Sequence, residues 1–335
     1  MKFRLIALAA ALAAVLAAAP SFAEVKEVRI SKGFGILYLP LFIMEDQKLL
    51  EKHAAQAGLP DVKTSWTVID GGNLINDAMM TGNLDFAGIG APGFITLWAK
   101  ARGIANLEVV GISSLSATSL WLNTNNPKIA SLKDFSPNDR IALPGIKTSL
   151  SAVVLQMMVA KEFGRENFAK LDPLTVGLPH PEALTALLSG RTEITAHFTS
   201  PPFSYLELKD PKIRRVASSV DSLGNITLDV VFASKKFVEA NPKITQAFIA
   251  ALDDANAFIA RDKPGAAAIY ARLSKVKVSE AEVVEMLKDP DTQFSTTPVS
   301  VMDFADFMHL AGTIKTKPAT WKDLFVTPLH GRSGS

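Results

Sequence analysis

The stretch that decides the fold is residues 70–92, DGGNLINDAMMTGNLDFAGIGAP. It contains three glycine turns, which are separated by a short amphipathic segment and a short apolar segment. At the first turn, Gly71 and Gly72 can adopt a positive φ or bring the backbone close to a neighbour. Asn73 is then predicted to cap a helix over residues 74–81.

The same stretch predicts a strand that leads directly into a second helix. Gly82 ends the first helix, and residues 84–89 have the small and apolar composition of a buried strand. Gly90 and Ala91 turn the chain, and Pro92 suits the first position of the next helix. Two helix N-termini are therefore expected at two glycine turns.

A second copy of this pattern lies at residues 180–200, HPEALTALLSGRTEITAHFTS. Aligning Gly190 with Gly82 superimposes the helical segments and places His197 on Ile89. The chain before each copy also matches, with RISKGFG and RIALPGI each leading into an apolar helix. We interpret the repeat as two homologous α/β lobes, the alternative being that strand–helix units resemble one another in general.

The first 23 residues have the pattern of a secretory signal peptide. Lys2 and Arg4 precede an alanine- and leucine-rich run, and residues 21–23 (SFA) form a small-x-small cleavage site. We expect cleavage after Ala23 and a periplasmic location. The sequence has no cysteine, which excludes disulfides, a lipid-anchor cysteine and thiolate chemistry.

The charge of the expected mature chain is balanced. Without Lys2 and Arg4, 33 of the 35 basic residues remain against 33 acidic residues, and both signs are dispersed. This balance argues against a nucleic acid or an anionic membrane as the partner.

Strand and helix patterns alternate along the chain, which predicts a mostly parallel sheet in each lobe. Residues 113–124 and 223–233 are candidate crossovers between the lobes. Helical patterns dominate from Pro242, and Ser279 with Glu282 forms a capping box, so a helical layer is expected on the first lobe. The predicted division is a signal peptide at 1–23, lobe I at 24–115, lobe II at 116–225, and the second part of lobe I at 226–335.

Several of these segments together resemble the periplasmic solute-binding proteins of ABC importers, in the branch for aliphatic sulfonates, taurine and nitrate. The segments are the signal peptide, the strand–turn–helix at 33–38, the helix–glycine–strand unit at 77–90, SLKDF…RIA within 129–142, and EALTALLSGRTEITAHFTSPPF at 182–203. The resemblance implies a type II Venus-flytrap fold of two α/β lobes that close on one solute. It also implies delivery of that solute to the transmembrane subunits of a permease, by a protein that we expect to be monomeric.

The residues themselves point to a site in the same cleft. In open α/β sheets, ligands bind beyond the carboxyl ends of the strands, where turns lead into helix N-termini. The predicted ligand-binding residues are Phe34, Gly35, Tyr38, Gly72, Asn73, Gly90, Ala91, Pro92, Lys147, Thr148, Ser149, His180, Thr199, Ser200 and Asp229.

Several of these residues have an alternative structural explanation. One interpretation of Lys147 and its neighbours is a solvated turn with a helix cap, and the other is that Lys147 supplies a counter-charge to an anion. The alternative for His180 is that it only caps the following helix or packs there, and His197 is interpreted as a satisfied interior or rim histidine. Asp229 either binds an amine of the ligand or forms a hydrogen bond within the hinge between the lobes.

The nature of the solute stays open between two classes. Converging helix N-termini favour an organic anion such as an alkyl sulfonate or taurine. The turns lack the arginine that sulfonate sites often use, however. The alternative is nitrate, a carboxylate, or a neutral or heteroaromatic solute such as a pyrimidine, against a wall formed by Phe34, Tyr38, Phe94 or Phe198.

An enzyme is the less favoured function, because the sequence has no G-x-S-x-G elbow, H-E-x-x-H motif or cysteine nucleophile. Its five histidines are scattered without metal-ligand spacing, so we expect no metal and no cofactor. Residues 88–93 match G-x-G-x-x-G, but they follow a later strand, and Glu108 precedes a strand instead of ending one. We therefore expect no nucleotide site and no catalytic residues.

Overall fold

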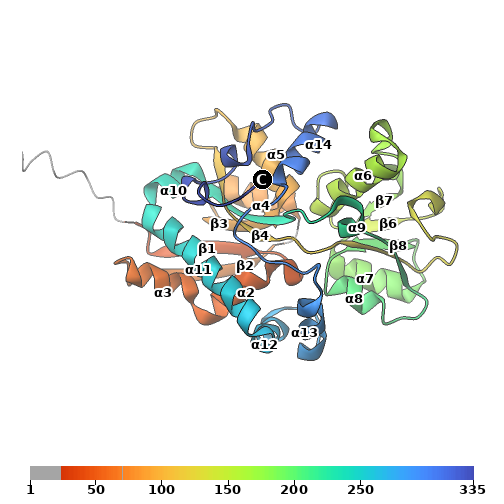
Figure 1. The fold of residues 1–335 in the computed structure, drawn as a ribbon, viewed down its shortest axis with the longest axis horizontal. Helices are drawn as coiled ribbons and strands as arrows, with labels where there is room; N and C mark the ends of the chain where they lie inside the picture. Colours follow the sequence, from red (N-terminus) through yellow and green to blue (C-terminus); the bar gives the residue numbers. More distant parts are fainter. Residues whose placement is uncertain (1–23, 70) are drawn as a thin grey trace, which may run out of the picture.

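A computed structural model describes residues 24–69 and 71–335; the predicted signal peptide lies outside these residues. Two five-stranded sheets form the centres of two lobes, which lie side by side along the long axis of the molecule (Figure 1). We call the lobe that contains the first strand lobe I and the other lobe II. The mixed α/β architecture that the alternating sequence pattern predicts is therefore confirmed.

The sheet of lobe I has three parallel strands at one side and an inserted antiparallel strand. β1 pairs in parallel with both β2 and β3, and β10 pairs antiparallel with β3 and β4. In spatial order the strands are β2 (Lys63–Val68), β1 (Glu27–Lys32), β3 (Phe86–Gly90), β10 (Asp229–Ser234) and β4 (Val109–Ser116).

The sheet of lobe II repeats this arrangement. β6 pairs in parallel with β7 and β8, and β5 pairs antiparallel with β8 and β9. In spatial order the strands are β7 (Thr175–Gly177), β6 (Ile141–Leu143), β8 (Ala196–Thr199), β5 (Trp121–Thr124) and β9 (Arg214–Ser218). The two lobes thus have equivalent strand orders, and each inserted strand follows a segment that arrives from the other lobe.

The inserted strands give a residue-by-residue alignment of the two lobes. β10 begins with Asp229 opposite Gly90, and β5 begins with Trp121 opposite Thr199. Asp229 and Trp121 therefore occupy equivalent positions, at the end of each sheet where the chain crosses between the lobes.

This register corrects one detail of the repeat. His197, two residues before the end of β8, matches Gly88 and not Ile89. A Cβ at Gly88 would lie 3.1 Å from the Tyr38 ring, and one at Gly33 would lie 2.5 Å from it. Lobe I therefore uses glycine where it accommodates a tyrosine ring, whereas lobe II places a histidine at the matching position.

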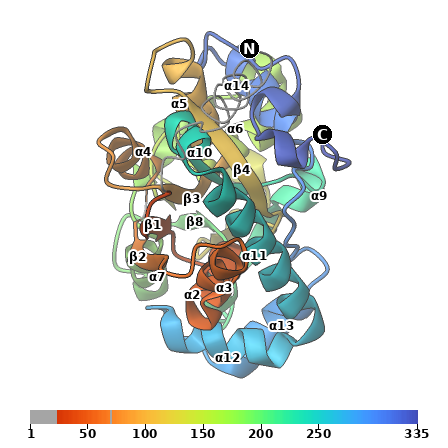
Figure 2. The same cartoon turned by 90° about the vertical axis from the view of Figure 1, so that its left-hand side faces the viewer.

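Nine α-helices of the described residues belong to lobe I. Because α11 packs on α2, α3 and β4, the helical part of the chain from Pro242 covers lobe I, as predicted (Figure 2). The nine are α2 (Leu39–Gln47), α3 (Leu49–Gln56), α4 (Gly72–Met80), α5 (Ala91–Ala101), α10 (Lys235–Ala240), α11 (Pro242–Arg261), α12 (Lys263–Leu273), α13 (Glu280–Lys288) and α14 (Val301–Leu310).

Four further α-helices surround the second sheet, and six short 3-10 helices lie in the connections. The helices of lobe II are α6 (Leu150–Phe163), α7 (His180–Ser189), α8 (Phe203–Glu207) and α9 (Ser219–Leu223). The 3-10 helices are Ile36–Tyr38, Leu132–Asp134, Arg165–Asn167, Asp172–Leu174, Trp321–Asp323 and Thr327–Leu329.

Two helix starts differ from the sequence prediction. Gly71, with φ 96°, is the N-cap of α4, so Asn73 lies inside the helix and is not its cap. Pro92 is the second residue of α5, since Ala91 is already helical. In each case the helix begins earlier than predicted, because the glycine turn itself can serve as the cap. The capping box of Ser279 and Glu282 is confirmed.

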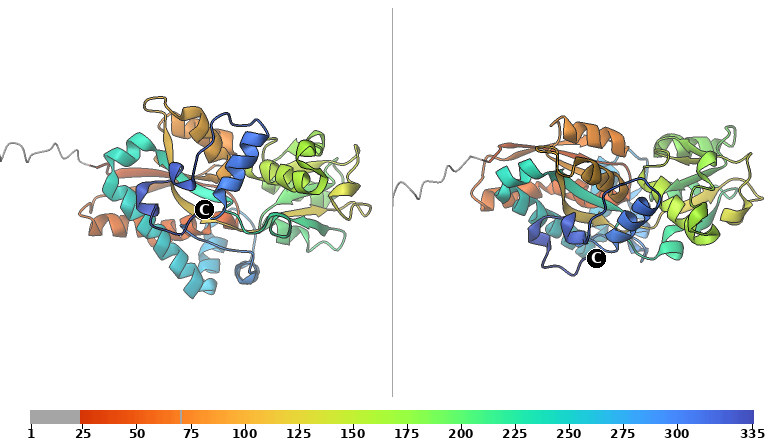
Figure 3. Two further views of the ribbon diagram at one scale, coloured as in Figure 1. Left: turned by 45° about the horizontal axis from the view of Figure 1, so that its top comes forward. Right: turned by 90° about the horizontal axis from the view of Figure 1, so that it is seen from above.

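The chain crosses between the lobes twice, between β4 and β5 and between β9 and β10 (Figure 3). The predicted crossovers contain both positions. Among residues 24–69 and 71–335, no helix combines the length and the apolar character that crossing a bilayer requires.

Candidate functional site

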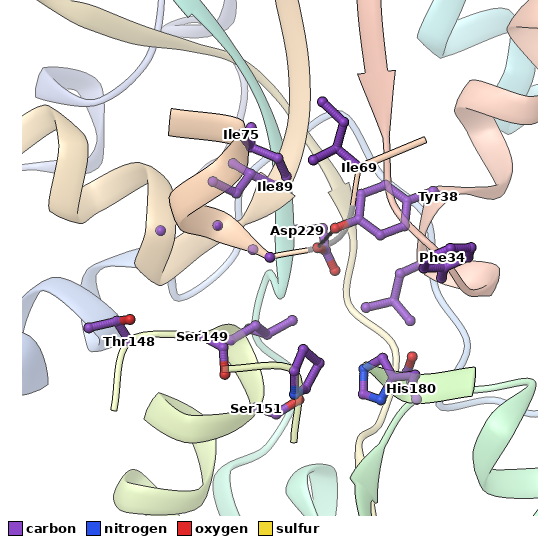
Figure 4. A pocket seen from close by; sticks show the side chains of 18 of the residues that line it. Phe34, Tyr38, Ile69, Ile75, Ile89, Thr148, Ser149, Ser151, His180 and Asp229 are labelled. Atoms are coloured by element: carbon purple, nitrogen blue, oxygen red, sulfur yellow. Dashed lines mark hydrogen bonds between the residues drawn. The ribbon is translucent and has the colours of Figure 1, made fainter. Parts of the chain in front are cut away.

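A cavity of about 70 Å³ lies between the two lobes (Figure 4). Both lobes contribute to its lining, and the contributing segments are the predicted turns at the ends of the strands. The lining residues are Phe34, Leu37, Tyr38, Ile69, Gly71, Gly72, Ile75, Ile89, Gly90, Gly93, Leu120, Pro144, Thr148, Ser149, Leu150, Ser151, His180, Ser200 and Asp229.

Most of the predicted ligand-binding residues line this cavity. They come from six short segments at strand ends or helix starts and from one inserted strand, which the two-lobed fold brings together from distant parts of the sequence. These residues are Phe34, Tyr38, Gly72, Gly90, Thr148, Ser149, His180, Ser200 and Asp229. Their contact with a solute stays a prediction.

The remaining predicted residues lie outside the lining. Asn73 borders an adjoining cavity of about 320 Å³, which shares Gly72 and Ser149 with the first. Lys147 is exposed at the turn before α6, with φ 66°, and lines neither of these cavities. The other predicted residues outside the lining are Gly35, Ala91, Pro92 and Thr199.

The two lobes touch each other beside the cavity. The Ile36 backbone N–H of lobe I donates a hydrogen bond of 3.0 Å to the Pro201 carbonyl of lobe II. A Cβ at Gly35 would lie 3.1 Å from the same carbonyl oxygen, and one at Gly90 would lie 2.7 Å from the Leu150 Cβ. These glycines allow the backbones of the two lobes to approach, so both lobes form walls of the cavity.

Asp229 is the acidic group of the cavity, and its side chain is almost completely buried. The Tyr38 hydroxyl donates to Oδ1 at 2.9 Å, and the Ser116 hydroxyl donates to Oδ2 at 3.3 Å. Burial raises the pKa of Asp229 to about 7, although both hydrogen bonds act in the opposite direction. Near neutral pH the carboxyl group can therefore accept a hydrogen bond from a ligand, or pair with a ligand cation.

Helices α4, α6 and α7 begin at the cavity. The Ser149 hydroxyl accepts a hydrogen bond from the Ala152 N–H at 3.2 Å and donates to the Gly145 carbonyl at 2.5 Å. This hydroxyl is therefore engaged in capping α6, which is the structural role that the sequence left open. The backbone N–H groups of the first turns still direct partial positive charge toward the cavity.

His180 lies on the lobe II side of the cavity (Figure 4) and connects to a buried polar chain. Its Nδ1 is 2.8 Å from His197 Nε2 and 3.0 Å from the Thr199 hydroxyl. His197 Nδ1 is in turn 2.5 Å from Glu207 Oε1, and Asn123 donates to Glu207 Oε2 at 2.8 Å. His197 is thus the satisfied interior histidine that the sequence predicted.

The rest of the lining is apolar or carries hydroxyl groups. Phe34, Leu37, Ile75 and Ile89 form apolar surface, and no lysine or arginine of the described residues lines the cavity. Within the same residues, no group of three or more histidine, cysteine, aspartate or glutamate side chains is arranged to hold a metal ion.

Sequence reasoning missed part of this site. Leu150 and Ser151 line the cavity because they follow the cap of α6, and the cap position was a signal that could have included them. Glu207 lies on α8, ten residues from His197, and no sequence period relates the two side chains. Only the packing of α8 on β5 and β8 brings them together.

A family model described as NMT1/THI5 like matches residues 72–267, which is more than half of the chain and includes most of the lining segments. Comparison with curated protein sequences gives no match.

Several solved structures share the fold across nearly the whole chain. The alkanesulfonate-binding protein SsuA from Xanthomonas axonopodis pv. citri, bound to MOPS, has a TM-score of 0.70 and 20% identity, over 92% of this chain and 98% of its own. The aliphatic sulphonate binding protein SsuA from Escherichia coli has a TM-score of 0.67 and 19% identity, over 90% and 93%.

The periplasmic nitrate-binding protein NrtA from Synechocystis PCC 6803 has a TM-score of 0.67 and 14% identity, over 90% of this chain and 84% of its own. At these identities the likeness establishes the fold alone. The resemblance to periplasmic binding proteins that the sequence motifs indicated is confirmed at the level of the fold.

Proposed function

The chain belongs to the NMT1/THI5-like family and has the two-lobed periplasmic binding protein fold, and from this premise we propose that it is the solute-binding component of an ABC importer. The observation that carries the proposal is the cavity between the lobes, which buried Asp229 of lobe I and His180 of lobe II both line. Such a site binds a small molecule by closing around it.

Binding proceeds by closure of the two lobes. A solute first contacts the turns of lobe I, and lobe II then closes over it. The contacts that only the closed state offers, such as His180 and the start of α6, supply the differential affinity that favours closure. The protein then delivers the solute to the transmembrane subunits of a permease at the periplasmic face of the membrane, and it acts as a monomer after removal of residues 1–23.

The preferred solute carries an N–H group. A carboxylate at Asp229 and an absence of lysine and arginine from the described lining disfavour a simple anion such as an alkyl sulfonate, nitrate or a carboxylate. Two of the predicted solutes satisfy Asp229 with an N–H donor: taurine through its ammonium group and an aminopyrimidine through its exocyclic amine. The apolar surface of Phe34 and Ile89 suits the carbon skeleton of either solute.

A thermal-shift series tests this function on protein refolded from denaturant to remove any solute carried through purification. Taurine is compared with ethanesulfonate, which lacks only the amine, and cytosine, nitrate and acetate complete the series. A solute at about a hundred times its Kd stabilises the protein by about 2.7 kcal/mol. We expect taurine or cytosine to raise Tm, and ethanesulfonate, nitrate and acetate to leave it unchanged.

The variant Asp229→Asn should lower the affinity for the solute that binds by about tenfold or more, because a charge-assisted hydrogen bond is lost. The control is Asp254→Asn, which removes an acid that pairs with His53 on the surface. Stabilisation by the simple anions alone would contradict the proposed solute class but not the transport role. Chemical conversion of the bound solute would contradict the function itself and favour an enzyme.

A further inference from the structure

A chain of four polar side chains leads from the interior of lobe II to the cavity. Asn123 contacts Glu207, Glu207 contacts His197, and His197 contacts His180, through atom pairs 2.8, 2.5 and 2.8 Å apart. The His197 and Glu207 side chains have no exposed surface at all. Glu207 and His197 each contact a polar side chain on both sides. The position of the proton on one residue therefore depends on the position of the proton on its neighbour.

His180 is the end of this chain, and one of its nitrogens remains available. Its Nδ1 is engaged with His197 and Thr199. Its Nε2 has no hydrogen-bond partner among residues 24–69 and 71–335, while the side chain is buried and lines the cavity. Nε2 is not among the described polar atoms that are fully buried without a partner, so it is accessible from the cavity, where a ligand atom can complete its hydrogen bonding.

The proton on Nε2 follows from the charge of the buried pair. If Glu207 and His197 together carry no net charge, the pair is either a carboxylate with an imidazolium or a carboxylic acid with a neutral imidazole. In both forms His197 Nε2 carries a proton and donates it to His180 Nδ1. His180 is neutral and must then carry its own proton on Nε2.

The opposite arrangement needs an uncompensated buried charge. For His180 to carry its proton on Nδ1, His197 Nε2 must accept, which leaves a neutral imidazole beside the Glu207 carboxylate. No lysine or arginine in the described part of the chain pairs with Glu207. Burying a lone carboxylate costs several kcal/mol, so the arrangement without net charge is favoured. Burial and the neighbouring His197 charge also hold the pKa of His180 well below its usual range, which keeps its ring neutral.

We propose that the Glu207–His197 pair fixes His180 as a hydrogen-bond donor through Nε2–H, which binds an acceptor atom of the solute. Because Asp229 faces the same cavity as an acceptor, the solute must present an N–H group on one side and an oxygen or unprotonated ring nitrogen on the other. This inference rests on the proposed function and narrows its solute class. It excludes solutes that carry amines alone.

Nitrogen NMR of histidine-labelled protein tests the tautomer without any solute. The His180 signals are identified by their loss in His180→Gln, and His309→Gln serves as the control because His309 is exposed on α14. We expect a protonated Nε2 and an unprotonated Nδ1 on His180. A protonated Nδ1 with an unprotonated Nε2 would overturn the proposal. The tautomer itself is read from the unmodified chain, and His180→Gln is used only to identify the signals.

Matched solutes then test the acceptor contact. Taurine is compared with ethylammonium, and cytosine with aniline, so that each pair shares the amine and differs in the acceptor. We expect the acceptor to improve affinity by about tenfold in the unmodified protein and to have no effect in His180→Phe. An acceptor advantage that persists in His180→Phe would overturn the contact. If none of these solutes binds, the proposed function fails, while the NMR result still decides the tautomer.

Discussion

The two lobes have the same strand order but differ at the first residue of the inserted strand. In lobe I this residue is Asp229, which accepts hydrogen bonds from Tyr38 and Ser116. In lobe II it is Trp121, whose ring stacks on Tyr205 with centroids 4.5 Å apart. The same backbone position therefore carries a hydrogen-bonded acid that lines the cavity in one lobe and a stacked aromatic ring in the other.

This difference shows how a repeated fold can supply two unlike sides to one cavity. Lobe I places its polar group directly at the strand end. Lobe II has an aromatic ring at that position. Its polar side chains begin two residues further along β5, at Asn123, and a series of hydrogen-bonded side chains connects Asn123 to the cavity through Glu207, His197 and His180. One sheet thus offers an acceptor, and the other offers a histidine held by a buried chain.

The largest effect that we expect from the difference between Asp229 and Trp121 is a dependence of the free energy of unfolding on pH. Because the pKa of Asp229 rises from 3.8 to about 7 on folding, the folded protein retains a proton that the unfolded chain releases. The contribution of the Asp229 carboxyl to the free energy of unfolding therefore falls by at most about 4 kcal/mol as the pH rises from about 4 to about 7. Asp229→Asn should remove this loss.

Urea unfolding at both ends of that pH range, for the unmodified protein and for Asp229→Asn, measures the effect. The difference between the two pH dependences isolates Asp229 from the other titrating groups. Identical pH dependences would mean that the strand-end carboxyl is solvated like an ordinary surface acid, and the contrast with Trp121 would lose its electrostatic basis.

A second prediction concerns the contact between the lobes. Gly90 has φ −58°, so leucine is compatible with its backbone, but its side chain would collide with Leu150 across the cleft. Gly90→Leu should prevent closure and lower solute affinity by about a hundredfold, because the closed state becomes rare. Stability without solute should change little.

Calorimetric titration with the solute measures this loss. Gly177→Leu is the matched control, since a Cβ at Gly177 meets no atom within 4 Å. Equal affinities in the two variants would show that the solute-bound lobes do not approach at Gly90.

The smallest effect on binding is expected at Trp121 itself. Trp121→Phe reduces the stacking on Tyr205 and the contact with the Arg215 guanidinium, which lies 4.7 Å from the ring. The free energy of unfolding should fall by about 1–2 kcal/mol, while solute affinity stays within about twofold. Chemical denaturation and titration of the same preparation give both values. A large loss of affinity would place Trp121 in the binding site, and the two strand ends would then be alike.

The sequence predicted the fold because its signals were local and occurred twice. The signals were the glycine turns, the helix–glycine–strand unit and the capping box, and each depends on residues close in sequence. The two-lobed architecture that they predict is the one that the structure has. Errors arose where one residue decided the outcome. Asn73 was predicted as a cap although Gly71 already serves that role, and His197 was matched one position away from its structural equivalent.

The site was harder to predict, because its polar contacts join distant elements. Tyr38 and Asp229 are 191 residues apart, and a hydrogen bond links them only after β10 enters the first sheet. Glu207 gave no sequence signal, since a glutamate on a short helix is usually exposed. The role of Lys147 as a counter-charge stays a prediction, because the residue type alone does not show which way its side chain turns.

The insertion of β10 between β3 and β4 also determines the order in which the lobes can be completed during synthesis. All five strands of lobe II lie between residues 121 and 218, so its sheet can close as soon as that segment is available. The sheet of lobe I has to wait for residues 229–234, and until then β3 and β4 lack their shared neighbour. Their unpaired edges are open to non-native pairing. The first lobe to be synthesised is therefore the last to be finished.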